Sequence, residues 1–166
     1  MQNRENSSII LCRGILCGIS YVVEVIKMKI EMETIFVGTQ TGVDISNLSP
    51  ALQKMIDVRK IRNGVLHATA IGSTGSITTI EFEPGLIEDM KRAIRLLAPP
   101  EDDYKHDAAW GDGNGHSHVQ AALIGPSVSL PIRDGKLALG TWQQVVAINH
   151  DNRPRDREIQ VTMIGE

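Results

Sequence analysis

The chain has 166 residues, of which 42% are hydrophobic and 22% are charged. This composition is typical of a globular protein with one core, and it excludes a disordered or a fibrous chain. A net charge of −3 and an aromatic content of only 4% argue against a broad nucleic-acid-binding surface, so we expect no nucleic acid among the partners.

The first 27 residues differ from the rest of the chain. They contain both cysteines, so the remaining residues offer no thiolate for a disulfide or a zinc site. Residues 9–26 are largely apolar but include two charges, which makes a membrane span or an export signal the less favoured interpretation. Met28 opens a strand-like segment. We therefore predict an N-terminal extension over 1–27 outside the core, a single domain over 28–166, and no membrane association.

Alternating polarity, apolar stripes and turn residues predict the elements of this domain. In chain order they are a strand over 29–37, a helix over 50–59 capped by Asp44 or Ser46, strands over 64–71 and 74–83, a helix over 84–97, a polar loop over 101–115, a short helix over 119–124, and strands over 128–132, 136–149 and 158–164. Many strands with two or three helices in mixed order indicate an α+β fold with mostly antiparallel sheets.

Three of the five histidines, His106, His116 and His118, lie in or next to the polar loop, together with Asp112. Imidazole and carboxylate groups suit Zn²⁺ and similar ions. A His-x-His pair can converge from an extended loop, whereas positions i and i+2 of a helix diverge. We therefore expect His116 and His118 to precede the helix and to bind a divalent metal, most simply zinc, with His106, while Asp112 orients one imidazole. The alternative is that these histidines cap the helix or hydrogen-bond within the loop.

Glycines in the same loop have a second interpretation. Gly113, Asn114 and Gly115 lead into the predicted helix, where free backbone N–H groups attract phosphate. The alternative is a flexible turn. Arg153, Arg155 and Arg157 are expected to form a solvated turn, of which Arg155 is the candidate for a ligand's phosphate.

Further candidates lie on the predicted strands. Thr79, Glu81 and Glu83 share the polar face of the strand over 74–83. Glu81 or Glu83 could complete a metal shell or act as a base, and Gln143 could orient a substrate. His67 lies within a strand and is expected to be structural, whereas His150 lies at a turn.

Several motifs together resemble the YjbQ-like family, an uncharacterised family also named the secondary thiamine-phosphate synthase family. They are Gly-Ser-Thr-Gly-Ser-Ile-Thr-Thr-Ile-Glu-Phe-Glu-Pro-Gly at 72–85, Tyr-Lys-His at 104–106, Gly-Asn-Gly-His-Ser-His at 113–118, Ala-Ala-Leu-Ile-Gly-Pro at 121–126, Gly-Lys-Leu-Ala-Leu-Gly-Thr-Trp-Gln-Gln at 135–144 and Asp-Asn-Arg-Pro-Arg at 151–155. The resemblance covers about 28–166. One departure is Gly72, where many members carry a histidine.

The resemblance implies a small α+β fold whose sheets pack orthogonally around a threefold axis in a cytoplasmic homotrimer. It also implies a weak thiamine-phosphate synthase activity, which joins a pyrimidine diphosphate to a thiazole phosphate and releases pyrophosphate. Together with the histidine loop, it predicts a trimeric metal-binding enzyme acting on a small phosphorylated metabolite. The alternative is a non-catalytic small-ligand-binding or interaction protein with a structural metal or phosphate site.

Overall fold

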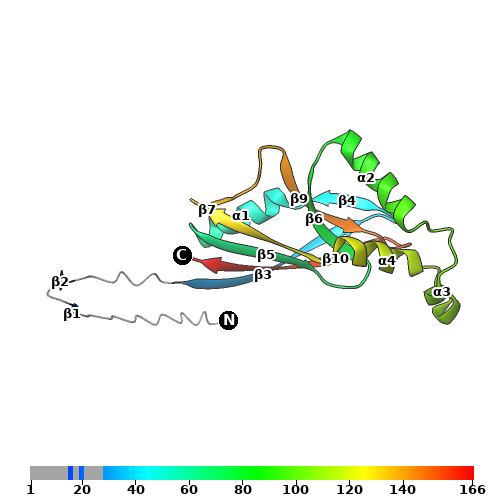
Figure 1. The fold of residues 1–166 in the computed structure, drawn as a ribbon, viewed down its shortest axis with the longest axis horizontal. Helices are drawn as coiled ribbons and strands as arrows, with labels where there is room; N and C mark the ends of the chain where they lie inside the picture. Colours follow the sequence, from blue (N-terminus) through cyan, green and yellow to red (C-terminus); the bar gives the residue numbers. More distant parts are fainter. Residues whose placement is uncertain (1–14, 17–18, 21–27) are drawn as a thin grey trace.

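The computed structural model describes residues 15–16, 19–20 and 28–166 (Figure 1). Two short strands, β1 (Ile15–Leu16) and β2 (Ile19–Ser20), pair antiparallel. The rest of the predicted N-terminal extension lies outside the described residues. No helix in the described part of the chain combines the length and the apolar character that crossing a membrane requires.

Two antiparallel sheets form the main body. The larger sheet has the strand order β3-β10-β5-β7-β8, and the smaller has the order β4-β9-β6. The five strands are β3 (Lys29–Thr39), β10 (Arg155–Gly165), β5 (Gly64–Ala70), β7 (Ser127–Arg133) and β8 (Lys136–Leu137). The other three are β4 (Asp44–Asn47), β9 (Gln143–Asn149) and β6 (Gly75–Glu81). The predicted α+β class with mostly antiparallel sheets is therefore confirmed.

The central strand β9 shows how the layers are arranged. Its side chains alternate between two hydrophobic clusters, as the period of two in a strand requires. Val145 and Ala147 join the main cluster, which is formed with the five-stranded sheet and with helix α1 (Ser49–Arg59). Val146 and Ile148 join a second cluster, which helix α2 (Pro84–Leu97) covers (Figure 1). Burial on both faces explains why this strand reads as a continuous apolar run.

The outer face of the five-stranded sheet is exposed and partly apolar. On β3, Ile30, Met32 and Phe36 are 68%, 77% and 70% exposed. The charged residues between them face the other side, where Glu31 and Glu33 form ion pairs with Arg59 of α1. The half-buried strand of the sequence analysis is present, but its apolar side is the one that a single chain leaves exposed.

The chain has four helices in its described part, where the sequence predicted two or three. Helix α3 (Lys105–Trp110) lies inside the predicted loop, and α4 (Gly115–Ile124) begins four residues earlier than expected. The predicted caps of α1 were also wrong: the first helical N–H, that of Ser49, donates to Asn47 Oδ1, while the Asp44 carboxylate accepts from the N–H of Gln40. Helix α2 begins as predicted, with the Glu83 carboxylate accepting from two backbone N–H groups.

Candidate functional site

Two loops meet at the end of the molecule that carries α3 and α4 (Figure 1). One loop, residues 111–114, connects the two helices, and the other, residues 150–154, connects β9 to β10. The side chain of Asn152 joins them, because its Nδ2 donates to the carbonyl oxygens of Asp112 at 2.8 Å and Gly113 at 3.2 Å. Polar residues from both loops therefore lie at one corner.

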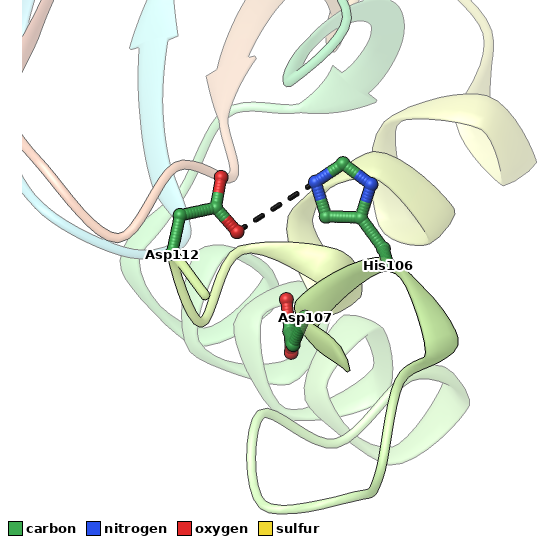
Figure 2. Close-up of side chains that lie close together, drawn as sticks. All are labelled: His106, Asp107 and Asp112. Carbon is green, nitrogen blue, oxygen red and sulfur yellow. Dashed lines mark ion pairs between the residues drawn. The ribbon is translucent and has the colours of Figure 1, made fainter. Parts of the chain in front are cut away.

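His106, Asp107 and Asp112 form a group of potential metal ligands at this corner (Figure 2). One donor atom from each lies within 4.8 Å of the other two. The His106 Nε2 to Asp112 Oδ1 distance is 3.6 Å, too long for a hydrogen bond. It suits two ligands of one ion, because bonds of about 2.1 Å in tetrahedral geometry place ligand atoms roughly 3.4 Å apart. The spacing of His106 and Asp112 is therefore one that a zinc-like ion would accept, with Asp107 within reach as a third ligand.

The two remaining histidines of the predicted set diverge. Both lie within α4, so the prediction that they precede the helix and share one pocket was wrong. The ring of His118 lies 4.5 Å from that of His106, beside the ligand group. His116, two positions earlier on the helix, is buried, and its ring lies 6.3 Å from that of Tyr104. Burial lowers the pKa of His116 in spite of the neighbouring Asp107 carboxylate, which keeps the ring neutral at pH 7.

The segment of Gly113, Asn114 and Gly115 is held by hydrogen bonds and close packing. Gly115 donates its N–H to Asp107 Oδ1 at 2.7 Å, and a Cβ at this position would lie 2.4 Å from Cβ of Tyr104. Asn114 is buried, and its side-chain oxygen accepts from the backbone N–H of Asn152. Close packing of α3 against α4 thus explains Gly115, and its N–H is already occupied by a carboxylate rather than left free for a phosphate.

A buried ion network supports the second loop. The side chain of Asp151 is only 2% exposed and accepts hydrogen bonds from Thr74 Oγ1 and Arg155 Nε, both at 2.9 Å. Burial alone would raise the pKa of Asp151, but these bonds and the charges of Arg155 and Arg157 hold it below its ordinary value. Arg155 itself remains about half exposed.

The expectation of a solvated arginine turn was wrong for Arg157. This side chain is buried and donates to the carbonyl oxygen of Thr74 and to Oδ1 of Asn149. The Arg157 guanidinium also lies next to Gly72, since a Cβ added to Gly72 would lie 3.7 Å from Nη1 of Arg157. Gly72 therefore lies beside a buried guanidinium.

His150, which was expected at a turn, follows directly after β9, is completely buried and is central to a polar network. Its Nε2 lies 2.7 Å from Ser76 Oγ, and its Nδ1 lies 3.2 Å from Gln120 Oε1. Its carbonyl oxygen accepts from Ser117 Oγ at 2.6 Å. The usable signal in the sequence was the polar run Asn-His-Asp at 149–151, directly after the apolar run at 145–148. Burial, followed by the charges of Arg157 and His116, lowers the pKa of His150 to about 4.

This pKa predicts a pH dependence of stability. The folded value of about 4 lies below the ordinary 6.5, so protons bind the unfolded chain more readily. The free energy of unfolding should therefore fall by about 3 kcal/mol as the pH drops from 6.5 to 4. Urea unfolding across this range measures the loss, and His150→Asn should flatten it while His67→Asn should not. An NMR titration of the His150 ring with a midpoint near 6.5 would contradict the prediction.

Two predicted catalytic residues lie elsewhere in the chain. Glu81 and Gln143 are register partners at one end of the β6–β9 pair, whereas Gly75 and Asn149 are partners at the other. Seven-residue strands separate these ends by about 20 Å. Gln143 donates to Thr79 Oγ1 at 2.9 Å and accepts from a backbone N–H. A single chain therefore does not bring Glu81 or Gln143 to the histidines, and Glu83 is used as the cap of α2.

His67 lies on the larger sheet, away from this corner of the molecule. Its ring nitrogens lie 2.8 Å from hydroxyl oxygens of Ser129 and Thr69 on the exposed sheet face. Both nitrogens are thus occupied within the sheet, which fits the structural role expected of it.

Comparisons with known proteins agree with this fold. The family described as "UPF0047 protein YjbQ-like" matches residues 33–166. A UPF0047 protein of Methanothermobacter thermautotrophicus is 30% identical over 84% of this chain and 95% of its own length. One of Archaeoglobus fulgidus is 33% identical over 74% of this chain and 93% of its own.

Solved structures agree as well. The crystal structure of a YbjQ-like protein of unknown function from Sulfolobus solfataricus aligns with a TM-score of 0.80 and 30% identity, over 84% of this chain and 99% of that one. A YjbQ/UPF0047 protein of Clostridium acetobutylicum aligns with a TM-score of 0.73 and 29% identity, over 79% and 98%. The chain therefore belongs to the YjbQ-like family of UPF0047 proteins.

Proposed function

We propose that the chain is a divalent-metal-dependent enzyme acting on a small phosphorylated metabolite. The observation that carries this proposal is the group formed by His106 and Asp107 of α3 with Asp112 of the following loop, which Asn152 ties to the loop that leads into Arg155. A metal ion and an exposed arginine at one corner are the combination that phosphate esters require.

His106 and Asp112 are the ligands that the geometry favours most. Their donor atoms are 3.6 Å apart, and both side chains are partly exposed. One oxygen of Asp107 is already engaged by Gly115, so its second oxygen would complete the set. His118 stands beside His106 as a further candidate. When bound, a zinc-like ion would polarise a phosphoryl oxygen of the substrate.

Arg155 is the residue we propose for the phosphate. Buried Asp151 holds its Nε, which fixes the direction of the guanidinium while leaving its other nitrogens to bind an anion. Asn114 and Gly113 would contribute by shaping the loop next to it rather than by donating free N–H groups. A reaction of the thiamine-phosphate synthase type, which handles two phosphorylated compounds, is one candidate reaction of this class.

We also propose a cytoplasmic homotrimer, as the family resemblance implies. The exposed apolar face of the larger sheet supports an oligomer. Besides the β3 residues it includes Val65 of β5 and Ile164 of β10, 46% and 44% exposed. Faces of this kind are typical of surfaces that subunits cover. Glu81 and Gln143 would join the site in such a trimer only if a neighbouring chain supplied them.

The test is metal analysis combined with anion binding. Protein purified without a histidine tag is expected to hold about one divalent ion per chain, as a site with one open position would. Inorganic pyrophosphate should bind to the zinc-loaded protein, and both chelation and Arg155→Ala should weaken binding by about tenfold or more. Arg133→Ala, on β7, is the matched control and should bind normally.

The same measurements separate the alternatives. A structural metal site would lower the melting temperature on chelation without any effect on pyrophosphate binding. A non-catalytic binding protein would bind pyrophosphate equally well with and without metal. Protein that holds no metal, and takes up none from micromolar zinc, would overturn the proposed function.

A further inference from the structure

His116 carries an unpaired polar atom in the interior. His116 is only 7% exposed. Among the buried side-chain nitrogens and oxygens of residues 28–166, its Nδ1 is the one without a hydrogen-bond partner. An atom of this kind calls for an explanation, because buried polar groups in folded proteins are almost always paired.

Counting protons shows which form of the ring is present. The hydroxyl of Ser117 has one hydrogen, and it donates that hydrogen to the carbonyl oxygen of His150 at 2.6 Å. Ser117 Oγ can therefore only accept from Nε2 of His116, which lies 3.1 Å away. The proton of the neutral ring thus sits on Nε2, and Nδ1 presents a bare lone pair.

The carbonyl oxygen of His150, which determines the position of the proton on the His116 ring through Ser117, is itself held in place. The side-chain amide of Gln120 donates to the carbonyl oxygen of Ala98 at 2.8 Å, which turns its Oε1 toward His150. Nδ1 of His150 must then donate to Gln120, and its Nε2 accepts from Ser76. Each partner in this chain of bonds has one consistent role, so His150 and its carbonyl oxygen are held in place.

His116 lies next to the part of the chain that holds the proposed metal group, since its helix α4 packs against α3. Asp107, one of the proposed metal ligands, is the carboxylate whose charge acts most strongly on His116. The ring of Tyr104 lies 6.3 Å from the ring of His116. Helix α3 bounds this side of the site, and none of its residues is buried. A short helix without buried side chains can move to admit a ligand at a lower free-energy cost than the packed sheets can.

We propose that Nδ1 of His116 is a preset hydrogen-bond acceptor for a hydroxyl or N–H group of the substrate. The inference rests on the proposed function and adds a requirement to it: the phosphorylated metabolite carries a donor group close to its phosphate. A fixed acceptor distinguishes a substrate that has the donor from an analogue without it, because only the former satisfies the buried atom.

The experiment uses three phosphate monoesters as probes, namely ethyl, 2-hydroxyethyl and 3-hydroxypropyl phosphate. Calorimetry on the zinc-loaded protein should show at least one hydroxyl ester binding about tenfold more tightly than ethyl phosphate, the worth of one hydrogen bond. In His116→Phe the three esters should bind within about twofold of one another. His67→Phe is the matched control and should keep the preference.

A second readout follows the ring itself. In ¹⁵N NMR spectra of the free protein, Nδ1 of His116 should resonate as an unprotonated ring nitrogen, and it should shift with the preferred hydroxyl ester but not with ethyl phosphate. Ser117→Ala should mix the two forms of the ring and reduce the preference. A protonated Nδ1, or equal binding of all three esters to the unmodified protein, overturns the inference. In that case, binding of ethyl phosphate would still support the proposed function. If no ester binds, the proposed function fails and the inference fails with it.

Discussion

Replacing His106 with alanine is expected to lower the zinc affinity of the chain by about a hundredfold or more. Loss of a residue that only supports a ligand already costs up to about that factor, and His106, 3.6 Å from Asp112, is a direct ligand in the proposed metal group. Asp112→Asn should act in the same direction, because a neutral amide replaces a charged oxygen of the same shape. Competition with a zinc-binding dye measures the affinity of each variant.

The matched control is His67→Ala. His67 is exposed like His106 but lies on the larger sheet, where Ser129 and Thr69 occupy both ring nitrogens. It should leave the zinc affinity unchanged. The melting temperature of the zinc-free protein should change little in His106→Ala, since this side chain is partly exposed and belongs to a short helix without buried residues. Equal zinc affinity in His106→Ala and the unmodified chain would remove His106 from the metal group.

His116→Ala separates the sequence-based ligand set from the geometric one. The sequence placed His106, His116 and His118 together, whereas the structure groups His106 with two aspartates and buries His116. If the geometric set holds, the zinc affinity of His116→Ala should fall far less than that of His106→Ala. Equal losses would favour the sequence-based set.

The sequence predicted those elements whose pattern is set by burial of one face. Strand β6 and helix α2 appear close to their predicted bounds, because the period of two or 3.6 is written in their own residues. Helix α3 has no such pattern. It has six residues, no buried side chain and no side-chain cap, and the bond from Gly115 to Asp107 ties it to α4. A helix held by a contact eight residues away leaves little local signal.

The candidate site divides in the same way. His106 and Asp112 could be singled out from the sequence, because they lie six residues apart in one polar segment. The roles of Arg157 and His150 could not, since both depend on pairing between strands that are distant in sequence: Arg157 reaches Thr74 across 83 residues, and His150 reaches Ser76 across 74. Pairing also explains why Glu81 lies far from the histidines, as the register of β6 with β9 sends it to the opposite end.

Strand β3 exposes apolar side chains and turns its glutamates toward α1, which is unfavourable for a single chain in water. Water surrounds Met32 and Phe36 in a single chain, while the glutamates of the same strand are used for ion pairs with α1. Ile30 of β3, Ile164 of β10 and Val65 of β5 are register partners, and with Met32 they form an apolar patch on this face, whereas Phe36 lies opposite Glu158 of β10. A subunit that covers the patch would remove this surface from water.

The double variant Met32→Glu, Phe36→Glu is therefore expected to convert the proposed trimer to single chains. Each introduced carboxylate would be buried without a partner in the interface, at a cost of several kcal/mol. In the isolated chain both would face water, and only the one at position 36 would lie opposite a carboxylate, Glu158, at a cost of about 1 kcal/mol or less. Light scattering should give three times the chain mass of 18.2 kDa for the unmodified protein and a single chain mass for the variant. The variant's melting temperature, read at low concentration, checks that it remains folded.

Leu97→Glu provides the control for a general effect of surface charge. Leu97 lies at the end of α2 and is 69% exposed, close to the 70% of Phe36, but it lies outside the sheet face. It should leave the mass unchanged. If Glu81 and Gln143 reach the metal corner from a neighbouring chain, the double variant should also lose pyrophosphate affinity, and Leu97→Glu should not. A trimer that survives both substitutions on β3 would show that subunits associate through another surface, and a single-chain mass for the unmodified protein would contradict the trimer itself.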